Sequence, residues 1–282
     1  MKHQYLESQA IGPDGPVGLR WYRPAITRRV PGPTLVWAHG GAFFGGGIKQ
    51  PEAHDVARAL ADRGVAVVTV DYRLAPLPGV HWAFKGGARQ RERFPRPMED
   101  LLTALRHGSD ESTGGLVLGG ASAGACLAAS AALRTLEMDL NLEGVILAYG
   151  FFHAVHPRSA EIRRRVRGHR RLTHSRWVLN AVNRNYAGTA AALADRLAFP
   201  GGHDLHGFPP TLMINADRDG VRASGDLLAG ELRAAGVEVE HHVLPGARHA
   251  FLNRPRLEEF GVGIELMRAW CSEVGESTSA AG

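Results

Sequence analysis

The chain has 282 residues, of which 44% are hydrophobic, and it carries 33 Lys and Arg against 28 Asp and Glu. A chain of this size can bury a large core, and we expect one domain spanning residues 1–282. The chain has only two cysteines, which argues against a disulfide framework. The N-terminus has no apolar signal region, which argues against a secreted protein, and no apolar run is long enough to span a bilayer. We therefore expect a cytoplasmic protein, with no membrane and no nucleic acid among its partners.

Apolar strands and alanine-rich helices alternate along the chain. The predicted strands are 17–22, 34–38, 65–70, 116–119, 143–149, 211–215 and 239–243. The predicted helices are 53–63, 97–107, 123–136, 176–186, 222–236 and 256–272. This alternation predicts an α/β fold, with a mostly parallel sheet covered by helices on both faces. The small and polar residues 275–282 are expected to be disordered.

A glycine-rich loop follows the strand at 34–38 and runs from His39 to Gly47. Glycines directly after a strand let backbone N–H groups approach a ligand closely. The His-Gly-Gly pattern matches the oxyanion loop of esterases and lipases. A phosphate-binding loop is the alternative, but neither of the usual glycine fingerprints for phosphates is present.

The run Gly120-Ala121-Ser122-Ala123-Gly124 lies between an apolar strand and an alanine-rich helix. It matches the nucleophile elbow, G-x-S-x-G. The turn is so sharp that a Cβ at either glycine would collide with a neighbouring element. Ser122 is then held in a strained conformation at the tip, next to the free N–H groups of the helix that follows. This pattern predicts a serine nucleophile.

An acid and a histidine follow in the order that a serine hydrolase of the α/β type requires. Asp219 comes just past the strand at 211–215, with Asp217 as the alternative acid. His249 lies on the loop after the strand at 239–243, where its ring can reach the elbow. The chain order Ser122, Asp219, His249 therefore predicts a catalytic triad.

Four segments together resemble the hormone-sensitive lipase family of α/β hydrolases, in its bacterial esterase branch. They are 39–43, 71–76 with the sequence DYRLAP, 120–124 and 249–251. The resemblance implies the α/β-hydrolase fold and hydrolysis of short- to medium-chain carboxylic esters through an acyl-enzyme, without a cofactor. It also implies an oxyanion hole made by the backbone N–H groups of Gly40, Gly41 and Ala123.

Two departures from the family concern the cap over the active site. Only 38 residues precede His39, so the N-terminal cap helices of many members are not expected. A long insertion, 77–93, follows the DYRLAP segment. A long loop in a compact domain is often functional, although a mobile surface loop is the alternative. We expect the small cap to be formed by about 77–96 and 151–200.

Positive charge is concentrated in two stretches of these cap segments. Residues 85–96 contain five basic residues and one acidic residue, and residues 158–176 contain eight arginines and one glutamate. A basic cap could attract an anionic ester substrate or partner, whereas the alternative is a solvated helix face. Aromatic side chains are the candidate substrate-binding residues: Phe43, Phe44, Trp82, Phe84, Phe151, Phe152 and Trp177.

Several alternatives stay open at the level of sequence. The same triad serves amidases and formamidases, and the same scaffold could carry a lyase or a non-catalytic ligand binder. The 14 histidines form no cluster with metal-site spacing, so no metal is expected. A homodimer could form through 237–243 and 257–270.

Overall fold

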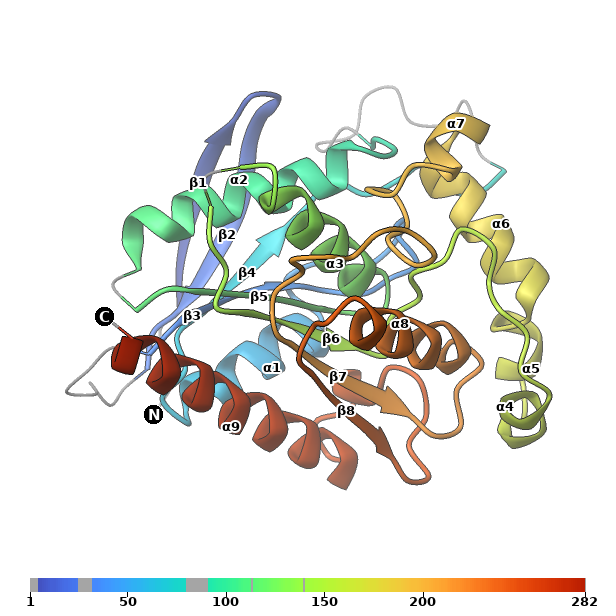
Figure 1. The fold of residues 1–282 in the computed structure, drawn as a ribbon. Coiled ribbons are helices and arrows are strands. Elements are labelled where there is room, and N and C mark those ends of the chain that lie inside the picture. Colours follow the sequence, from blue (N-terminus) through green and yellow to red (C-terminus); the bar gives the residue numbers. More distant parts are fainter. Residues whose placement is uncertain (1–4, 25–31, 80–90, 113, 139, 282) are drawn as a thin grey trace.

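The computed structural model describes residues 5–24, 32–79, 91–112, 114–138 and 140–281. Eight strands form one sheet in the order β1-β2-β4-β3-β5-β6-β7-β8 (Figure 1). The strands are β1 (Tyr5–Gly12), β2 (Gly15–Tyr22), β3 (Thr34–Ala38), β4 (Val67–Asp71), β5 (Leu116–Ala121), β6 (Gly144–Ala148), β7 (Thr211–Ala216) and β8 (Val239–Leu244).

The sheet is antiparallel at one edge and parallel over the rest. β1 pairs with β2 and β2 with β4 in antiparallel register, and every pair from β4 to β8 is parallel. Strands β3 to β7 are buried along their whole length, as expected for parallel strands covered on both faces. The predicted fold class is confirmed. Strand β1 was not predicted, because most of its side chains are exposed and its hydrophobic pattern is weak.

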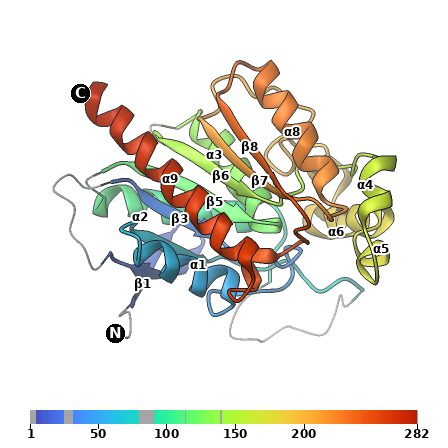
Figure 2. The ribbon, with the colours of Figure 1, turned by 90° about the horizontal axis from the view of Figure 1, so that it is seen from below.

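Helices cover both faces of this sheet (Figures 1 and 2). They are α1 (Pro51–Ala61), α2 (Arg96–Glu111), α3 (Ala123–Thr135), α4 (Ala160–Arg165), α5 (Arg170–Thr173), α6 (Arg176–Ala187), α7 (Ala190–Leu193), α8 (Arg222–Ala234) and α9 (Glu258–Ala281), with the 3-10 turn η1 (Phe251–Asn253). One buried core lies between the sheet and α2, α3 and α8. A second core lies between the sheet and α1 and α9.

Two sequence expectations differ from the structure at the helices. Helix α9 continues to Ala281, so the prediction of a disordered end from residue 275 is wrong. The connection from β6 to β7 contains four short helices, α4 to α7, of which only α6 was predicted. These helices lie together beyond the sheet, in yellow and yellow-green in Figure 1. Most of the other expected cap segment, 77–96, is outside the described residues.

The carboxyl ends of the parallel strands bring the distant motifs together. β3 leads into the glycine-rich loop, β5 into Ser122, β7 into the acidic loop and β8 into the loop of His249. Because parallel strands all end at one edge of the sheet, residues far apart in the chain meet there. The elements themselves therefore place a site at this edge.

Close contacts of backbone with backbone shape the elbow between β5 and α3. A Cβ on Gly124 would lie 2.3 Å from the carbonyl oxygen of Ala38, and one on Gly120 would lie 2.3 Å from that of Gly124. Ser122 has φ 53° and ψ −117°, a conformation that side-chain-bearing residues rarely adopt. The predicted reason for both glycines is therefore met in the structure.

We predict that Gly124→Ala lowers the free energy of unfolding by about 1–3 kcal/mol, because the added methyl group must displace backbone. Gly230→Ala in α8 is the matched control, since a Cβ there meets nothing within 4 Å. Gly230→Ala should raise the free energy of unfolding by about 0.5–1 kcal/mol, because alanine has a higher helix propensity than glycine. Urea unfolding measures both, and equal stabilisation by the two alanines would contradict the packing account.

Candidate active site

Ser122 lies at the tip of the elbow with its hydroxyl against a histidine. Its backbone N–H donates to the carbonyl of Ala148 at 2.9 Å, which fixes the turn to the end of β6. The Oγ atom lies 2.9 Å from Nε2 of His249. This is the distance at which an imidazole can accept the hydroxyl proton.

Asp219 lies behind the histidine and is completely buried. Its Oδ2 atom accepts from Nδ1 of His249 at 2.6 Å. Its Oδ1 atom accepts from the backbone N–H of Val221 at 3.0 Å and from Nδ1 of His174 at 3.1 Å. The predicted residues Ser122, His249 and Asp219 are thus brought together in one hydrogen-bonded chain.

The environment of Asp219 keeps its carboxylate charged. Burial alone would raise the pKa of this carboxyl. The charge of His249 and the hydrogen bonds from His174 and His249 outweigh burial and hold the pKa well below its ordinary value. The site therefore contains a fixed negative charge facing His249.

The alternative acid, Asp217, faces a different part of the molecule. Its Oδ1 atom accepts from Arg165 at 2.7 Å and from Arg222 at 3.5 Å. Its Oδ2 atom accepts from the backbone N–H of Gly246 at 3.3 Å. Asp217 therefore links α4 and α8 to the loop after β8, while Asp219 alone of the two contacts the histidine.

The expectation for Gly40 as an oxyanion donor is contradicted. Its N–H donates to Oε2 of the buried Glu52 at 2.6 Å, so it points away from the space beside Ser122. Among the described residues, no hydrogen-bond acceptor is found for the N–H groups of Gly41, Ala42 or Ala123. These three amides are the available donors, and Ala42 was missed because the pattern alone does not show which amides of the loop are used.

Glu52 is a buried carboxyl that supports the loop and the histidine from behind. Besides binding Gly40, it accepts from the hydroxyl of Tyr149 at 2.6 Å. The ring of Tyr149 packs edge-on against His249, with centroids 5.1 Å apart. Burial raises the pKa of Glu52, although the hydrogen bonds from Tyr149 and Gly40 act in the opposite direction. No signal in the sequence identified Glu52.

His174 is a second histidine on the same acid, and the sequence analysis missed it. It is contributed by the β6–β7 connection, just after α5, and its ring packs edge-on against His249 with centroids 4.6 Å apart. Burial lowers its pKa, while Asp219 partly opposes this effect. Through His174, the arginine-rich segment (residues 158–176) contacts the site.

One potential ligand atom from each of His174, Asp219 and His249 lies within 4.8 Å of the other two, which is close enough to suggest a metal site. The geometry argues otherwise. Nδ1 of His249 is only 2.6 Å from Asp219, as in a direct hydrogen bond. A metal ion about 2 Å from each ligand would separate their atoms further.

The aromatic residues expected to bind substrate divide into three groups. Phe43, Phe151 and Phe152 are buried in the core, where Phe43 stacks on Tyr186 with centroids 3.9 Å apart, so their assignment as pocket walls is corrected. Phe44 is half-buried against the same core. Trp177 is exposed and lines a cavity. The remaining two, Trp82 and Phe84, are outside the described residues.

A family profile described as the α/β hydrolase fold matches residues 35–253. The chain belongs to this family. The sequence is 29% identical over 265 residues to carboxylesterase NlhH of Mycobacterium tuberculosis, covering 88% of this chain and 76% of that protein. It is 30% identical over 174 residues to 3-O-acetylpapaveroxine carboxylesterase of Papaver somniferum, a match that spans 53% of this chain and half of the poppy protein.

Solved structures agree with this assignment. An esterase from Pyrobaculum calidifontis has a TM-score of 0.79 at 28% identity, over 98% of this chain and 86% of that chain. Brefeldin A esterase, described as a bacterial homologue of human hormone-sensitive lipase, shares the fold with a TM-score of 0.81 at 22% identity. The match covers 97% of this chain and 77% of that chain. The predicted family and the predicted class of carboxylic ester hydrolase are confirmed. No helix among the described residues is long and apolar enough to cross a membrane.

We predict that Asp219→Asn lowers kcat of ester hydrolysis about a thousandfold, because the amide cannot support a protonated His249. Asp217→Asn is the matched control and should keep most of the wild-type kcat, since Asp217 contacts arginines instead. Steady-state kinetics on one ester compares the two. A larger loss in Asp217→Asn would reverse the assignment of the acid.

A pH prediction follows from His156, whose buried ring donates from Nε2 to the carbonyl of Gly220 at 2.9 Å. Burial lowers its pKa from 6.5 to about 4. The unfolded chain therefore binds the proton first, and the stability that a neutral His156 gives at neutral pH is lost as pH falls from about 6.5 to about 4. His156→Gln should lose less stability than the wild type over that interval. Urea unfolding at pH 7 and pH 4.5 measures the difference, and equal losses would contradict the prediction.

Proposed function

We propose that Ser122, His249 and Asp219 are the catalytic triad of this ester hydrolase. The observation that carries the proposal is the unbroken chain of hydrogen bonds from Ser122 Oγ through His249 to the buried Asp219. In the proposed reaction Ser122 attacks the ester carbonyl while His249 accepts its proton. His249 then gives that proton to the leaving alkoxide, and an acyl-enzyme remains.

Water completes the cycle. His249 accepts a proton from the water as the water attacks the acyl group, and it returns this proton to Ser122 Oγ when the acid leaves. Asp219 keeps its charge throughout and stabilises the imidazolium. The N–H groups of Gly41, Ala42 and Ala123 are the proposed donors to the oxyanion, since preorganised donors lower the energy of the charge that develops in the transition state.

The cap is the second part of the proposal. We infer that the β6–β7 connection with α4 to α7, within the predicted range 151–200, covers the site as part of a single domain. Its support is the contact of His174 with both Asp219 and His249. The segment 77–96 is proposed to complete the cap on the basis of sequence alone.

The substrates proposed for this site are esters of short to medium acyl groups. Ethyl acetate hydrolase of Pseudomonas putida, 29% identical over 266 residues, is named for a small ester. No observation favours the amidase, lyase or ligand-binding alternatives. The cytoplasmic location, the homodimer and the anionic character of the substrate stay predictions of the sequence.

The test is hydrolysis of p-nitrophenyl esters from acetate to decanoate by the wild type and by Ser122→Ala. The wild type should prefer the shorter esters, and the variant should lose at least a thousandfold in kcat, because the nucleophile is gone. A fluorophosphonate probe should label the wild type on the peptide that contains Ser122. A folded wild type that neither turns over esters nor takes the probe would contradict the proposal and favour a lyase or a binder.

A further inference from the structure

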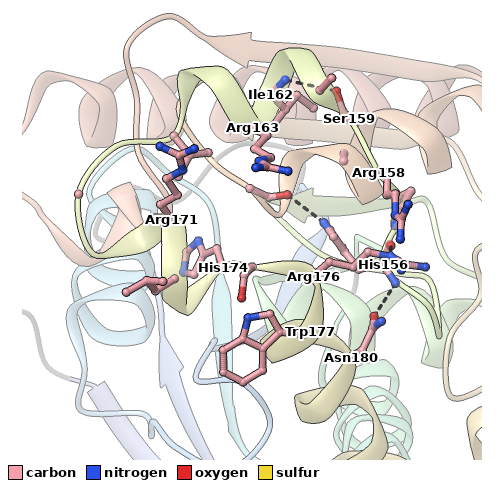
Figure 3. A pocket seen from close by; sticks show the side chains of 18 residues that line it. His156, Arg158, Ser159, Ile162, Arg163, Arg171, His174, Arg176, Trp177 and Asn180 are labelled. Atoms are coloured by element: carbon pink, nitrogen blue, oxygen red, sulfur yellow. Dashed lines mark hydrogen bonds between the residues drawn. The ribbon is translucent and has the colours of Figure 1, made fainter.

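A cavity of about 910 Å³ lies between the arginine-rich segment and the end of β7, and its lining includes His156, His174, Asn180 and Gly220 (Figure 3). Its walls come from α4, α5 and α6, from the segments before and between them, and from Gly220 and Ala223 at the start of α8. Ser122 is not among the lining residues. The cavity therefore lies beside the triad on its cap side, where His174 is the lining residue that contacts Asp219 and His249, and it has the size of a site for a small organic molecule.

Among the described residues, the cavity is lined by four arginines and by no acidic side chain. The arginines are Arg158, Arg163, Arg171 and Arg176. None of them has a carboxylate partner among the residues that the structure describes, and Arg176 donates only to the carbonyl of His156 at 2.7 Å. Arg165 of the same segment behaves differently, because it pairs with both Asp217 and Glu161. Within the described part of the chain, these four guanidinium groups are thus not paired with carboxylates.

Apolar side chains complete the lining. Trp177 and Leu172 are about 70% exposed, so both offer apolar surface to a ligand in the cavity. Ile162, Val166 and Ala223 form a small buried cluster on the same cavity. A ligand that satisfies both features has an anionic group for the arginines and an alkyl or aromatic part for the apolar surface.

His174 connects this cavity to the catalytic residues. His174 lines the cavity, and its Nδ1 atom donates to Asp219, which also accepts from His249. The cavity is thus separated from Ser122 by two imidazole rings in edge-on contact. An ester whose carbonyl lies at Ser122 can place a group in the cavity only if a chain of several carbons joins the two.

We propose that this cavity is the subsite for a carboxylate or phosphate carried by the ester substrate, several carbons from the scissile bond. The proposal rests on the triad proposed above. Guanidinium groups bind carboxylates and phosphates with paired hydrogen bonds, which are stronger than those between neutral groups. The natural substrate is therefore an amphipathic anionic ester, and the neutral esters used in the assay above are only its analogues.

The experiment compares two ester series. The first is the mono-p-nitrophenyl esters of dicarboxylic acids from succinate to sebacate, and the second is the neutral p-nitrophenyl alkanoates of the same chain length. The ratio of kcat/KM for the anionic ester over the neutral one should rise with chain length in the wild type. In Arg163→Gln/Arg171→Gln, the ratio at the longest chain should be about tenfold lower than in the wild type, because the charged hydrogen bonds are lost.

Arg164→Gln/Arg167→Gln is the matched control. It removes the same charge from the same segment, but these two arginines lie on a different surface hollow that contains Asp217. Long-range attraction of an anion depends on net charge and would fall equally in both double variants. Only a subsite distinguishes them, so the control should keep the wild-type ratio. If the test variant does not fold, Arg171→Gln alone is measured in the same way.

The outcomes separate this inference from the proposed function. No turnover of either series by the wild type would overturn both. Turnover with equal ratios in the wild type and both variants would overturn the subsite alone. Free suberate, which carries the anionic groups without a scissile ester, should inhibit competitively against the half-ester. Inhibition that is not competitive would show an effector site for free anions and would overturn a substrate subsite.

Discussion

The buried carboxylate of Asp219 is the group on which the rest of the site depends. A charge without water is costly to bury unless hydrogen bonds and an opposite charge surround it. Here the loop amide of Val221, the ring of His249 and the ring of His174 all donate to it. The same carboxylate thus holds together the loop after β7, the loop after β8 and the connection from β6 to β7. A substitution at any one of these three places is expected to alter the positions of the other two.

A second buried acid plays the corresponding role on the other side of the serine. Glu52 binds the N–H of Gly40 and the hydroxyl of Tyr149, which packs against His249. The glycine-rich loop is held in left-handed conformations at Ala42 and Phe43, with φ of 53° and 67°. Such conformations persist only where the surroundings enforce them. Glu52 provides one such restraint, and the buried stack of Phe43 on Tyr186 provides another.

The sequence alone was sufficient to predict the fold and to single out Ser122, Asp219 and His249, which lie in one hydrogen-bonded chain. Parallel strands give long apolar runs, and the elbow and the order of the acid and the histidine depend on local spacing, which a single sequence displays. The choice of Asp219 over Asp217 came from the resemblance to the hormone-sensitive lipase family, and the contacts of Asp217 with Arg165 and Arg222 explain why only one of them faces the histidine.

The errors at the site share a physical cause, since each depends on a partner distant in sequence. Gly40 is not a free donor because Glu52 reaches it from α1. His174 reaches the site because the connection from β6 to β7 folds back to the acidic loop after β7. Phe151 and Phe152 lie in the core that includes residues of α3 and α6. Periodicity and motif spacing carry no information on such contacts.

The most direct test of the account is the proton that His249 and Asp219 share. In a proton NMR spectrum of the enzyme with nitrogen-15-labelled histidine, the Nδ1 proton of His249 should appear far downfield, as expected for a short hydrogen bond to a carboxylate. It should persist in His174→Gln, and it should move upfield in Asp219→Asn. A downfield proton that is unchanged in Asp219→Asn, or that is lost only in His174→Gln, would contradict the central role of Asp219.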